Sequence, residues 1–479
     1  MSSPVENMIR GMVTQAVTKI SEFNRDRRKA EGPNPYLIGI HTPMTAELTL
    51  TELAVSGTIP PELDGTYMRN GPNPIRPPNP ATHHWFVGTG MVHGVRLEGG
   101  RARWYRNRWI RGREVSQVLR EPPAPGIRTE GFDTPNTNVV GHAGAIWAIV
   151  EAGGNPVRID GELATVAHDP FGGTLHHAFS AHPHLDPATG EQHAICYHAQ
   201  VKDTVWHVVV GADGRVRREE PIAVQDGPSI HDCMITPHYV IVLDLPVTFS
   251  MRTLLAGHPF PYRWNPAHRA RVGLMPREGK GSDTIWCDVE PCYVFHPANA
   301  YETDDRRVIL DACVYDRVFD DGYAGPSLNR VPFERWTIDP ATRRVERRVI
   351  DAAPQEFPRP NEQRIGQPYR YAYTLALPEG GSPAFLDAPR LYKHDLTADK
   401  RQVHDFGAEH VAGEFVFVPR ASAAAEDDGW LMGLVIDKAR ETTDLVILDA
   451  AQFEREPQAR ITIPHRVPPG FHGNWIPAR

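Results

Sequence analysis

The sequence is rich in histidine, a residue type that binds transition metals. It holds 23 His among 479 residues, whereas its five Cys show no paired CxxC spacing. Four histidines stand beside turn or strand-end residues with apolar neighbours, in FSAHPHLDP, SIHDCMITPHYV, YVFHPANAYE and GFHGNW: His182, His231, His296 and His472. Neutral imidazole suits zinc, copper, nickel and iron. The four are 49, 65 and 176 residues apart, so no local motif such as HExxH joins them.

A metal site built from these imidazoles requires a fold that brings distant segments together. After Gly32-Pro33 the chain consists of short β-branched or aromatic runs, such as YVIVLDLPVTF and RVILDACVYD, separated by turn-type clusters such as ADG and DPATG. This pattern favours a propeller or a sandwich array. A propeller points the inner strand of each blade at one axis. No fixed repeat of about 40–50 residues is visible, and no composition break marks a second domain.

The beginning of the chain has a different pattern. Apolar residues recur at helical spacing from Met8 to Phe23, and charges follow in SEFNRDRRKAEG. We therefore expect residues 1–32 to form an amphipathic helical extension and residues 33–479 to form a single β domain. The helix is expected to pack against its own domain, with contact to a membrane surface as the alternative.

Composition excludes several classes of protein. With 41% hydrophobic and 23% charged residues, the chain is typical of a soluble globular protein. No apolar run approaches a membrane span, and no secretory signal is visible, which predicts a cytoplasmic protein, in contact with a membrane at most at its surface. A net charge of −8 gives no electrostatic footprint for nucleic acid. The five Cys are expected to be buried thiols.

Several segments together resemble the carotenoid cleavage oxygenase family, which includes retinoid isomerase and lignostilbene-cleaving branches. They run in order from PPELDGTYMRNGPNP at residue 60 to GFHGNW at residue 470, and include HWFVGTGMVHG, NTNVVGHAG, IHDCMITPHYVIV, FHPANAYE and EFPRPNEQRIGQPYRYAY. The resemblance implies an all-β fold, a seven-bladed β-propeller with a helical and loop dome over one face. It also implies a non-haem Fe(II) dioxygenase that cleaves a C=C bond of a carotenoid or apocarotenoid with O2, giving two aldehydes.

The resemblance also implies roles for individual residues. One Fe(II) per chain is held by four ligands, His182, His231, His296 and His472. Three glutamates stand behind them and accept the far ring N–H: Glu151 in AIVEAGG, Glu356 in QEFPRP and Glu414 in AGEFVFVP. The family pattern leaves His182 without a carboxylate partner. Two further matches are Thr137 in PNTNVV, near the oxygen site, and Phe86 in HWF, in the substrate cleft.

The remaining histidines match no ligand position. Strand alternation is expected to turn His184, two residues after His182, away from the axis. Seven others lie in polar stretches and are expected to be solvated: His168, His193, His198, His207, His268, His394 and His404.

The substrate class depends on the residue before Glu151. Stilbene-cleaving members carry a Lys there that helps to hold the phenol, whereas this chain has Val150, and no Lys occurs between Lys29 and Lys202. An apolar Val lines a hydrocarbon tunnel but cannot stabilise a phenolate. The residues therefore favour an apolar carotenoid or apocarotenoid, with a stilbene as the alternative, since a Tyr from elsewhere could hold the phenol. A propeller that binds a ligand without catalysis is a second alternative.

A lipid substrate must be collected from a membrane or a carrier. The segment 244–264 reads DLPVTFSMRTLLAGHPFPYRW and supplies six large apolar side chains: Phe249, Leu254, Leu255, Phe260, Tyr262 and Trp264. This segment and the N-terminal helix are the two candidates for peripheral membrane contact.

Overall fold

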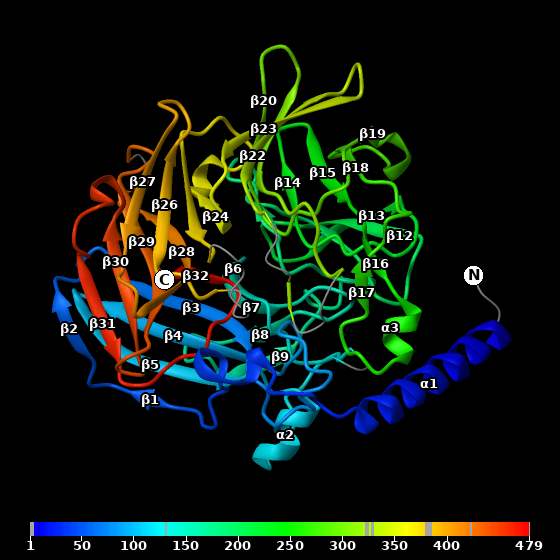
Figure 1. Cartoon of the computed structure of the whole chain (residues 1–479), viewed down its shortest axis with the longest axis horizontal. Coiled ribbons are helices and arrows are strands. Elements are labelled where there is room, and N and C mark those ends of the chain that lie inside the picture. The colour runs from blue at the N-terminus through cyan, green and yellow to red at the C-terminus, as the bar shows by residue number, and fades with distance from the viewer. Residues whose placement is uncertain are drawn as a thin grey trace.

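The computed structural model describes residues 4–129, 132–320, 325–326, 330–378, 386–421 and 424–478, with side chains from residue 16 onward. Three α-helices occur in these ranges: α1 (Pro4–Arg27), α2 (Arg113–Leu119) and α3 (Met251–Leu255). The predicted N-terminal helix is therefore confirmed as α1, which lies along the outside of the molecule (Figure 1). None of the helices described is long and apolar enough to cross a membrane.

Seven antiparallel sheets form the blades of a propeller, which confirms the predicted fold class (Figure 1). Blade 1 consists of β32 (Gly473–Pro477), β3 (Gly65–Pro72), β4 (Gly90–Glu98), β5 (Arg101–Trp109) and β1 (Thr49–Leu50). Blade 2 consists of β6 (Asn138–His142), β7 (Ala145–Ile149), β8 (Val157–Ile159) and β9 (Thr165–His168). Blade 3 consists of β10 (His184–Leu185), β11 (Gln192–Cys196), β12 (Thr204–Val210) and β13 (Val216–Ala223). Blades 4 and 5 consist of β14 (Cys233–Ile235), β15 (Tyr239–Asp244), β18 (Arg271–Pro276) and β19 (Ile285–Asp288); and β20 (Pro297–Glu302), β21 (Val308–Cys313), β22 (Phe333–Asp339) and β23 (Arg344–Asp351). Blades 6 and 7 consist of β24 (Gln355–Pro360), β25 (Tyr371–Ala376), β26 (Arg390–Asp395) and β27 (Lys400–Asp405); and β28 (His410–Pro419), β29 (Gly429–Asp437), β30 (Thr442–Asp449), β31 (Ala459–Ile463) and β2 (Ala54–Gly57).

The first strand named for each blade is its inner strand. The inner strands β14, β20, β24, β28, β32 and β6 contact one another in that order, and β10 contacts β14. Segments from both ends of the described chain close the ring, because β32 pairs with β3 in blade 1 and β2 pairs with β31 in blade 7. The inner strands therefore surround a common axis.

Three of the outer strands are rich in charged residues. The sequences VRREEPIA of β13, RVERRVID of β23 and KRQVHD of β27 place these residues on the free edges of blades 3, 5 and 6. Charged edge strands discourage pairing with another chain.

One segment interrupts blade 4 and covers a face of the propeller. Between β15 and β18 the chain forms the hairpin β16 (Val247–Phe249) and β17 (Tyr262–Trp264), with α3 between them. Helix α1 packs against α3: the Asn24 side-chain amide donates to the Leu255 carbonyl at 2.7 Å, and Arg25 Nε donates to the Gly257 carbonyl at 3.1 Å. This cover consists largely of loops.

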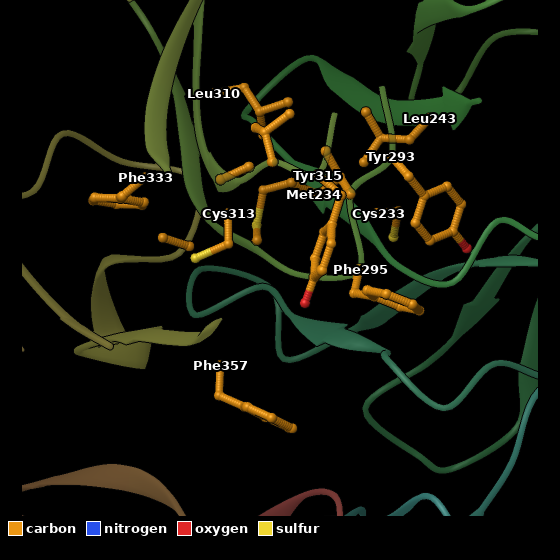
Figure 2. Packing of buried hydrophobic residues seen from close by; sticks show 14 of the residues in the cluster. Cys233, Met234, Leu243, Tyr293, Phe295, Leu310, Cys313, Tyr315, Phe333 and Phe357 are labelled. Carbon is orange, nitrogen blue, oxygen red and sulfur yellow. The ribbon is translucent and has the colours of Figure 1, made fainter. Parts of the chain in front are cut away.

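The main core lies between blades and extends to the axis. Figure 2 shows side chains from blades 4, 5 and 6 packed together, among them Cys233, Leu243, Leu310, Phe333 and Phe357. Burying each large apolar side chain contributes about 1.5–3 kcal/mol. All five Cys are buried and free, as expected, and burial raises the pKa of Cys292 to about 12.

The expectation that seven histidines are solvated is wrong for six of them, since only His198 is not buried. The polar residues beside them in the sequence suggested exposure, but their hydrogen-bond partners come from segments that are distant in the sequence. His193 Nδ1 lies 3.1 Å from His207 Nε2 on the paired strand, and His404 Nδ1 donates to the Phe453 carbonyl at 2.9 Å. His268 lies between two carboxylates, 2.9 Å from Asp244 and 3.1 Å from Asp226. These buried imidazoles are therefore satisfied by hydrogen bonds within a blade or, for His404, to the neighbouring blade.

We expect His268→Gln to destabilise the fold more at about pH 6 than at about pH 9. Burial alone would lower the pKa of His268, but hydrogen bonds to Asp244 and Asp226 outweigh it and raise the pKa above 6.5. The doubly bonded imidazolium therefore stabilises the fold fully below about pH 6.5, and this contribution is lost as the pH rises through the raised pKa. Urea unfolding should show a loss of about 1–3 kcal/mol at the lower pH.

His404→Gln is the matched control, because its partner is a neutral carbonyl. Burial lowers the pKa of His404 more than the bond to Phe453 raises it, so its variant should show the opposite pH trend. Equal losses for His268→Gln at both pH values would contradict the assigned charge state.

Candidate metal centre

Each inner strand carries one polar side chain of interest at or near the axis. Histidines stand directly before β20 and β32 and two residues before β10 and β14, Thr137 stands directly before β6, and two glutamates lie within β24 and β28. In blade order the residues are His472, Thr137, His182, His231, His296, Glu356 and Glu414. Glu151 is the exception, because it follows β7, the second strand of blade 2.

The four predicted imidazoles lie together. One ring nitrogen of each histidine lies within 4.8 Å of the corresponding nitrogen of the other three, and all four residues are buried. The Nε2 atoms of His231 and His296 are 3.2 Å apart. The ring of His182 lies 4.4 Å from that of His472, between centroids. Four segments from four blades thus supply one cluster of nitrogen donors.

The chemistry of the donor set fits a transition metal. Burial, together with the neighbouring imidazoles, holds the pKa of His182 well below 6.5, so its ring is neutral and keeps a lone pair. His182 Nε2 is buried and has no hydrogen-bond partner among the residues described. A buried polar atom without a partner is costly unless a ligand occupies it. A metal ion accepting this lone pair would remove that cost.

Three glutamates face the other nitrogen of three rings. The distance from His231 Nδ1 to Glu151 Oε2 is 2.7 Å, and that from His296 Nδ1 to Glu356 Oε2 is 2.6 Å. His472 Nδ1 lies 3.0 Å from Glu414 Oε1. A carboxylate at Nδ1 fixes the tautomer in which Nε2 is free to bind a metal.

Glu414 is also held by two donors of its own. Arg359 Nη1 donates to Oε1 at 3.2 Å, and the Gly473 amide donates to Oε2 at 2.9 Å. Burial alone would raise the pKa of Glu414, but Arg359 and His472 bring it down to about 2. Glu414 is therefore a carboxylate at any physiological pH.

Irregular strand pairing orients the two glutamates that lie within strands, Glu356 in β24 and Glu414 in β28. The pairing of β24 with β25 shifts between Glu356 and Arg359, and that of β28 with β29 shifts between Ala412 and Phe415. β-Bulges of this kind redirect side chains and occur beside active sites. Phe357, next to Glu356, has φ of 51° and stacks on His296 with ring centroids 5.1 Å apart. The residue that follows Glu356 in the chain thus packs its apolar ring against the face of the His296 imidazole.

The structure places a carboxylate near the one histidine that the family pattern left without a partner. Asp232 Oδ2 lies 3.6 Å from His182 Nδ1. Its other oxygen accepts from His184 Nε2 at 2.7 Å, so His184 turns toward Asp232 instead of joining the four-histidine cluster. Sequence analysis missed Asp232, although it directly follows His231 in IHDC.

An apolar cavity of about 460 Å³ adjoins three of the four imidazoles. Its wall combines the predicted residues Phe86, Thr137 and Val150 with aromatic rings from several segments, among them Phe260, Phe295 and Phe471. The ring of Phe86 meets those of Phe260 and Phe471 edge-on, with centroids 5.4 and 5.5 Å away. Thr137 is buried beside the centre, where its carbonyl accepts the His472 amide at 3.1 Å.

Two tyrosines also line this cavity, and neither was assigned to it from the sequence, where Tyr262 was expected to contact a membrane. Tyr197 and Tyr262 line it together with Val150 and Glu151, and their rings meet edge-on with centroids 5.8 Å apart. Tyr197 Oη lies 3.2 Å from Ser229 Oγ. Burial raises the pKa of both phenols, which stay neutral. Their places in the chain gave no signal, because they come from blade 3 and from the cover over blade 4.

A second, larger cavity, of about 1120 Å³, adjoins the same centre. It reaches His182, His296 and His472, and its wall includes Asp232, His184 and Arg359. The cluster of imidazoles thus adjoins two cavities, which differ in the charged residues beside the rings.

Comparisons with known proteins agree with this arrangement. Residues 41–477 match the family described as retinal pigment epithelial membrane protein. A carotenoid cleavage oxygenase of Mycobacterium tuberculosis is 43% identical, over 94% of this chain and 98% of its own length.

Two solved structures share the fold. Cobalt-substituted Synechocystis ACO superimposes with a TM-score of 0.80 at 29% identity, covering 91% of this chain and 97% of its own. The lignostilbene dioxygenase of Pseudomonas brassicacearum gives a TM-score of 0.82 at 27% identity, covering 94% and 100%. The chain therefore belongs to the carotenoid cleavage oxygenase family.

Proposed function

We propose that the chain is a non-haem Fe(II) dioxygenase that cleaves a C=C bond of a carotenoid or apocarotenoid with O2 and releases two aldehydes. The observation that carries this proposal is the cluster of four buried imidazoles at the wall of an apolar cavity. His182, His231, His296 and His472 would hold the iron, which when bound supplies the activation of dioxygen. Glu151, Glu356 and Glu414 orient three of these rings through Nδ1.

The proposal gives the remaining candidate residues, Phe86 and Thr137, roles at the cavity wall. The polyene lies along the aromatic wall, where Phe86 packs against it and water is excluded. Thr137 presents its side chain beside the imidazoles and limits the space open to dioxygen. Its Oγ1 donates to Asn136 Oδ1 at 3.0 Å, which leaves the methyl group as its apolar surface. Apolar contact alone suits a hydrocarbon chain, which offers no hydrogen-bonding groups along its length.

A stilbene substrate is the second candidate function, and Tyr197 and Tyr262 favour it. Neutral phenols beside Val150 could donate a hydrogen bond to a substrate hydroxyl. Against it, Tyr197 already has Ser229 as a partner, and the described residues that line the cavity include no Lys or Arg in place of the Lys that the stilbene branch carries at position 150. An apolar chain therefore fits this cavity better than a phenol.

We also propose that residues 33–479 form the catalytic domain and that α1 and α3 rest on a membrane from the cytoplasmic side. Ile20 and Phe23 of α1 are 48% and 56% exposed, and Met251 of α3 is 41% exposed. Phe260 and Tyr262, from the segment expected to contact membrane, are buried and line the cavity instead. The same segment thus joins the exposed apolar surface to the cavity, which suits delivery of a lipid.

Replacing His231, His296 or His472 by Ala should remove iron and activity together, because three ligands remain. We expect iron affinity to fall by more than about 100-fold, beyond what loss of an outer carboxylate produces. Iron content measured by mass spectrometry, with the aldehydes formed from a panel of carotenoids, apocarotenals and hydroxystilbenes, checks this. His238→Ala is the control, since His238 is exposed and paired with Glu302. Full iron occupancy in any ligand variant would refute the proposed set of ligands. A wild-type protein that holds no iron and still binds polyene would refute the proposed enzymatic activity.

Changing Glu151, Glu356 or Glu414 to Gln keeps the shape of the side chain but removes the charged acceptor. Turnover or iron retention should fall about 10–100-fold, with the fold intact by circular dichroism. Glu302→Gln removes a carboxylate from a histidine outside the centre and should change neither. If turnover is unchanged in all three centre variants, the glutamates do not act on the ligands.

Wild-type protein should cleave an apocarotenal faster than resveratrol at equal concentration, and Val150→Lys should reverse part of that preference. An ammonium group in the apolar cavity costs several kcal/mol unless it is paired, which opposes a polyene, whereas it stabilises a phenolate. The two kcat/KM values measure the change. Val150→Leu keeps the wall apolar and should keep the wild-type preference. A wild type that prefers resveratrol would overturn the substrate class but not the iron site.

The double variant Phe23→Ser, Met251→Ser should lose most of its binding to vesicles of phosphatidylcholine and phosphatidylglycerol. Both side chains are exposed, so the change removes apolar membrane contact without opening the core. Co-sedimentation measures the bound fraction. Val349→Ser alters an equally exposed residue of β23, at 44%, and should bind as wild type does. Equal binding by all three proteins would exclude this surface.

A further inference from the structure

The four imidazoles are not held equally. Three of them have a glutamate oxygen within 3.0 Å of Nδ1, as described above. Nδ1 of His182 has no glutamate, and the carboxylate that faces it among the residues described is Asp232, at 3.6 Å. His182 is therefore the ligand whose orientation depends on a different residue.

Asp232 is built into its place. It is buried, and its Oδ1 accepts from His184 Nε2 at 2.7 Å and from the Cys233 amide at 2.6 Å. These two donors fix one oxygen and leave Oδ2 directed at His182. A shortening of about 0.6 Å would bring that contact into the range of a charge-assisted hydrogen bond.

The chain geometry explains how one dipeptide serves two ligands. His231 and Asp232 are adjacent, just before β14, so that the first supplies a candidate ligand and the second faces the ligand of the neighbouring blade. His182 and His184 likewise flank Pro183 at the start of β10, which contacts β14. The two short segments AHPH and HD thus interlock between blades 3 and 4, at the wall of the larger cavity.

We propose that Asp232 is the fourth carboxylate of the centre, a positioning residue that holds His182 through Nδ1 and is itself held by His184. This inference rests on the metal site proposed above. The carboxylate selects the tautomer of His182 with a proton on Nδ1, which leaves the partnerless Nε2 as the donor to the metal. His184 acts on the metal only through Asp232.

The test uses Co(II) as the probe, because its visible absorption bands report ligand geometry without any turnover. Asp232→Asn should weaken Co(II) binding about 10–100-fold in competition with a chelator and should shift the bands. His184→Ala should have the same effect to a smaller degree. His184→Gln should restore most of the affinity, since the Gln amide can donate to Oδ1 in place of the imidazole.

Asp244→Asn is the matched control, because Asp244 is also buried and bonded to a histidine, His268, at 2.9 Å. It should lower the melting temperature but leave Co(II) affinity and bands unchanged. Wild-type affinity and bands in Asp232→Asn would overturn the inference, as would an equal loss of affinity in Asp244→Asn. If Asp232→Asn fails to fold, the difference between His184→Ala and His184→Gln decides, and its absence overturns the inference. Wild-type protein that binds no Co(II) would instead overturn the metal site itself.

Discussion

The centre depends on one geometric constraint, namely that seven inner strands must surround a common axis. Side chains at the start of such strands meet, however far apart they lie in the sequence. This is why imidazoles separated by up to 290 residues, from His182 to His472, can form one cluster. The three glutamates likewise come from other blades than the rings that they face. The metal site is therefore a property of the assembled ring.

The two cavities present different residues to the imidazoles. On one side the imidazoles face aromatic rings and Val150, and on the other they face His184, Asp232 and Arg359. Burying four histidines and three glutamates would be costly if each were alone. Pairing each glutamate with a ring nitrogen offsets part of that cost. Two of these glutamates, Glu151 and Glu356, still contribute to the wall of the apolar cavity, next to the rings that they face.

Features that depend on residues close together in the chain could be predicted from the sequence. The β texture after residue 33 favoured a propeller or a sandwich array, and the resemblance to the family then implied the propeller and the ligands His182, His231, His296 and His472. Burial of His268 could not be predicted, because its partner Asp244 lies 24 residues away on another strand. Asp232 was missed for a related reason: its role follows from facing the neighbouring blade, and nothing beside it in the chain signals this. Tyr197 reaches the cavity from the end of β11 in blade 3 and Tyr262 from the cover over blade 4, and no repeating pattern in the sequence indicates either position.

Closure of the ring by β32 has a consequence for the order of assembly. A ribosome produces β32 after the other described strands, and domains begin to fold while synthesis proceeds. The segment that leads into β32 carries His472, and its pairing with β3 joins residues about 400 positions apart. A nascent chain can therefore form most blades while its donor set is still incomplete. Tight capture of the ion must then wait until the propeller is sealed, so that retained metal would distinguish finished molecules from interrupted ones.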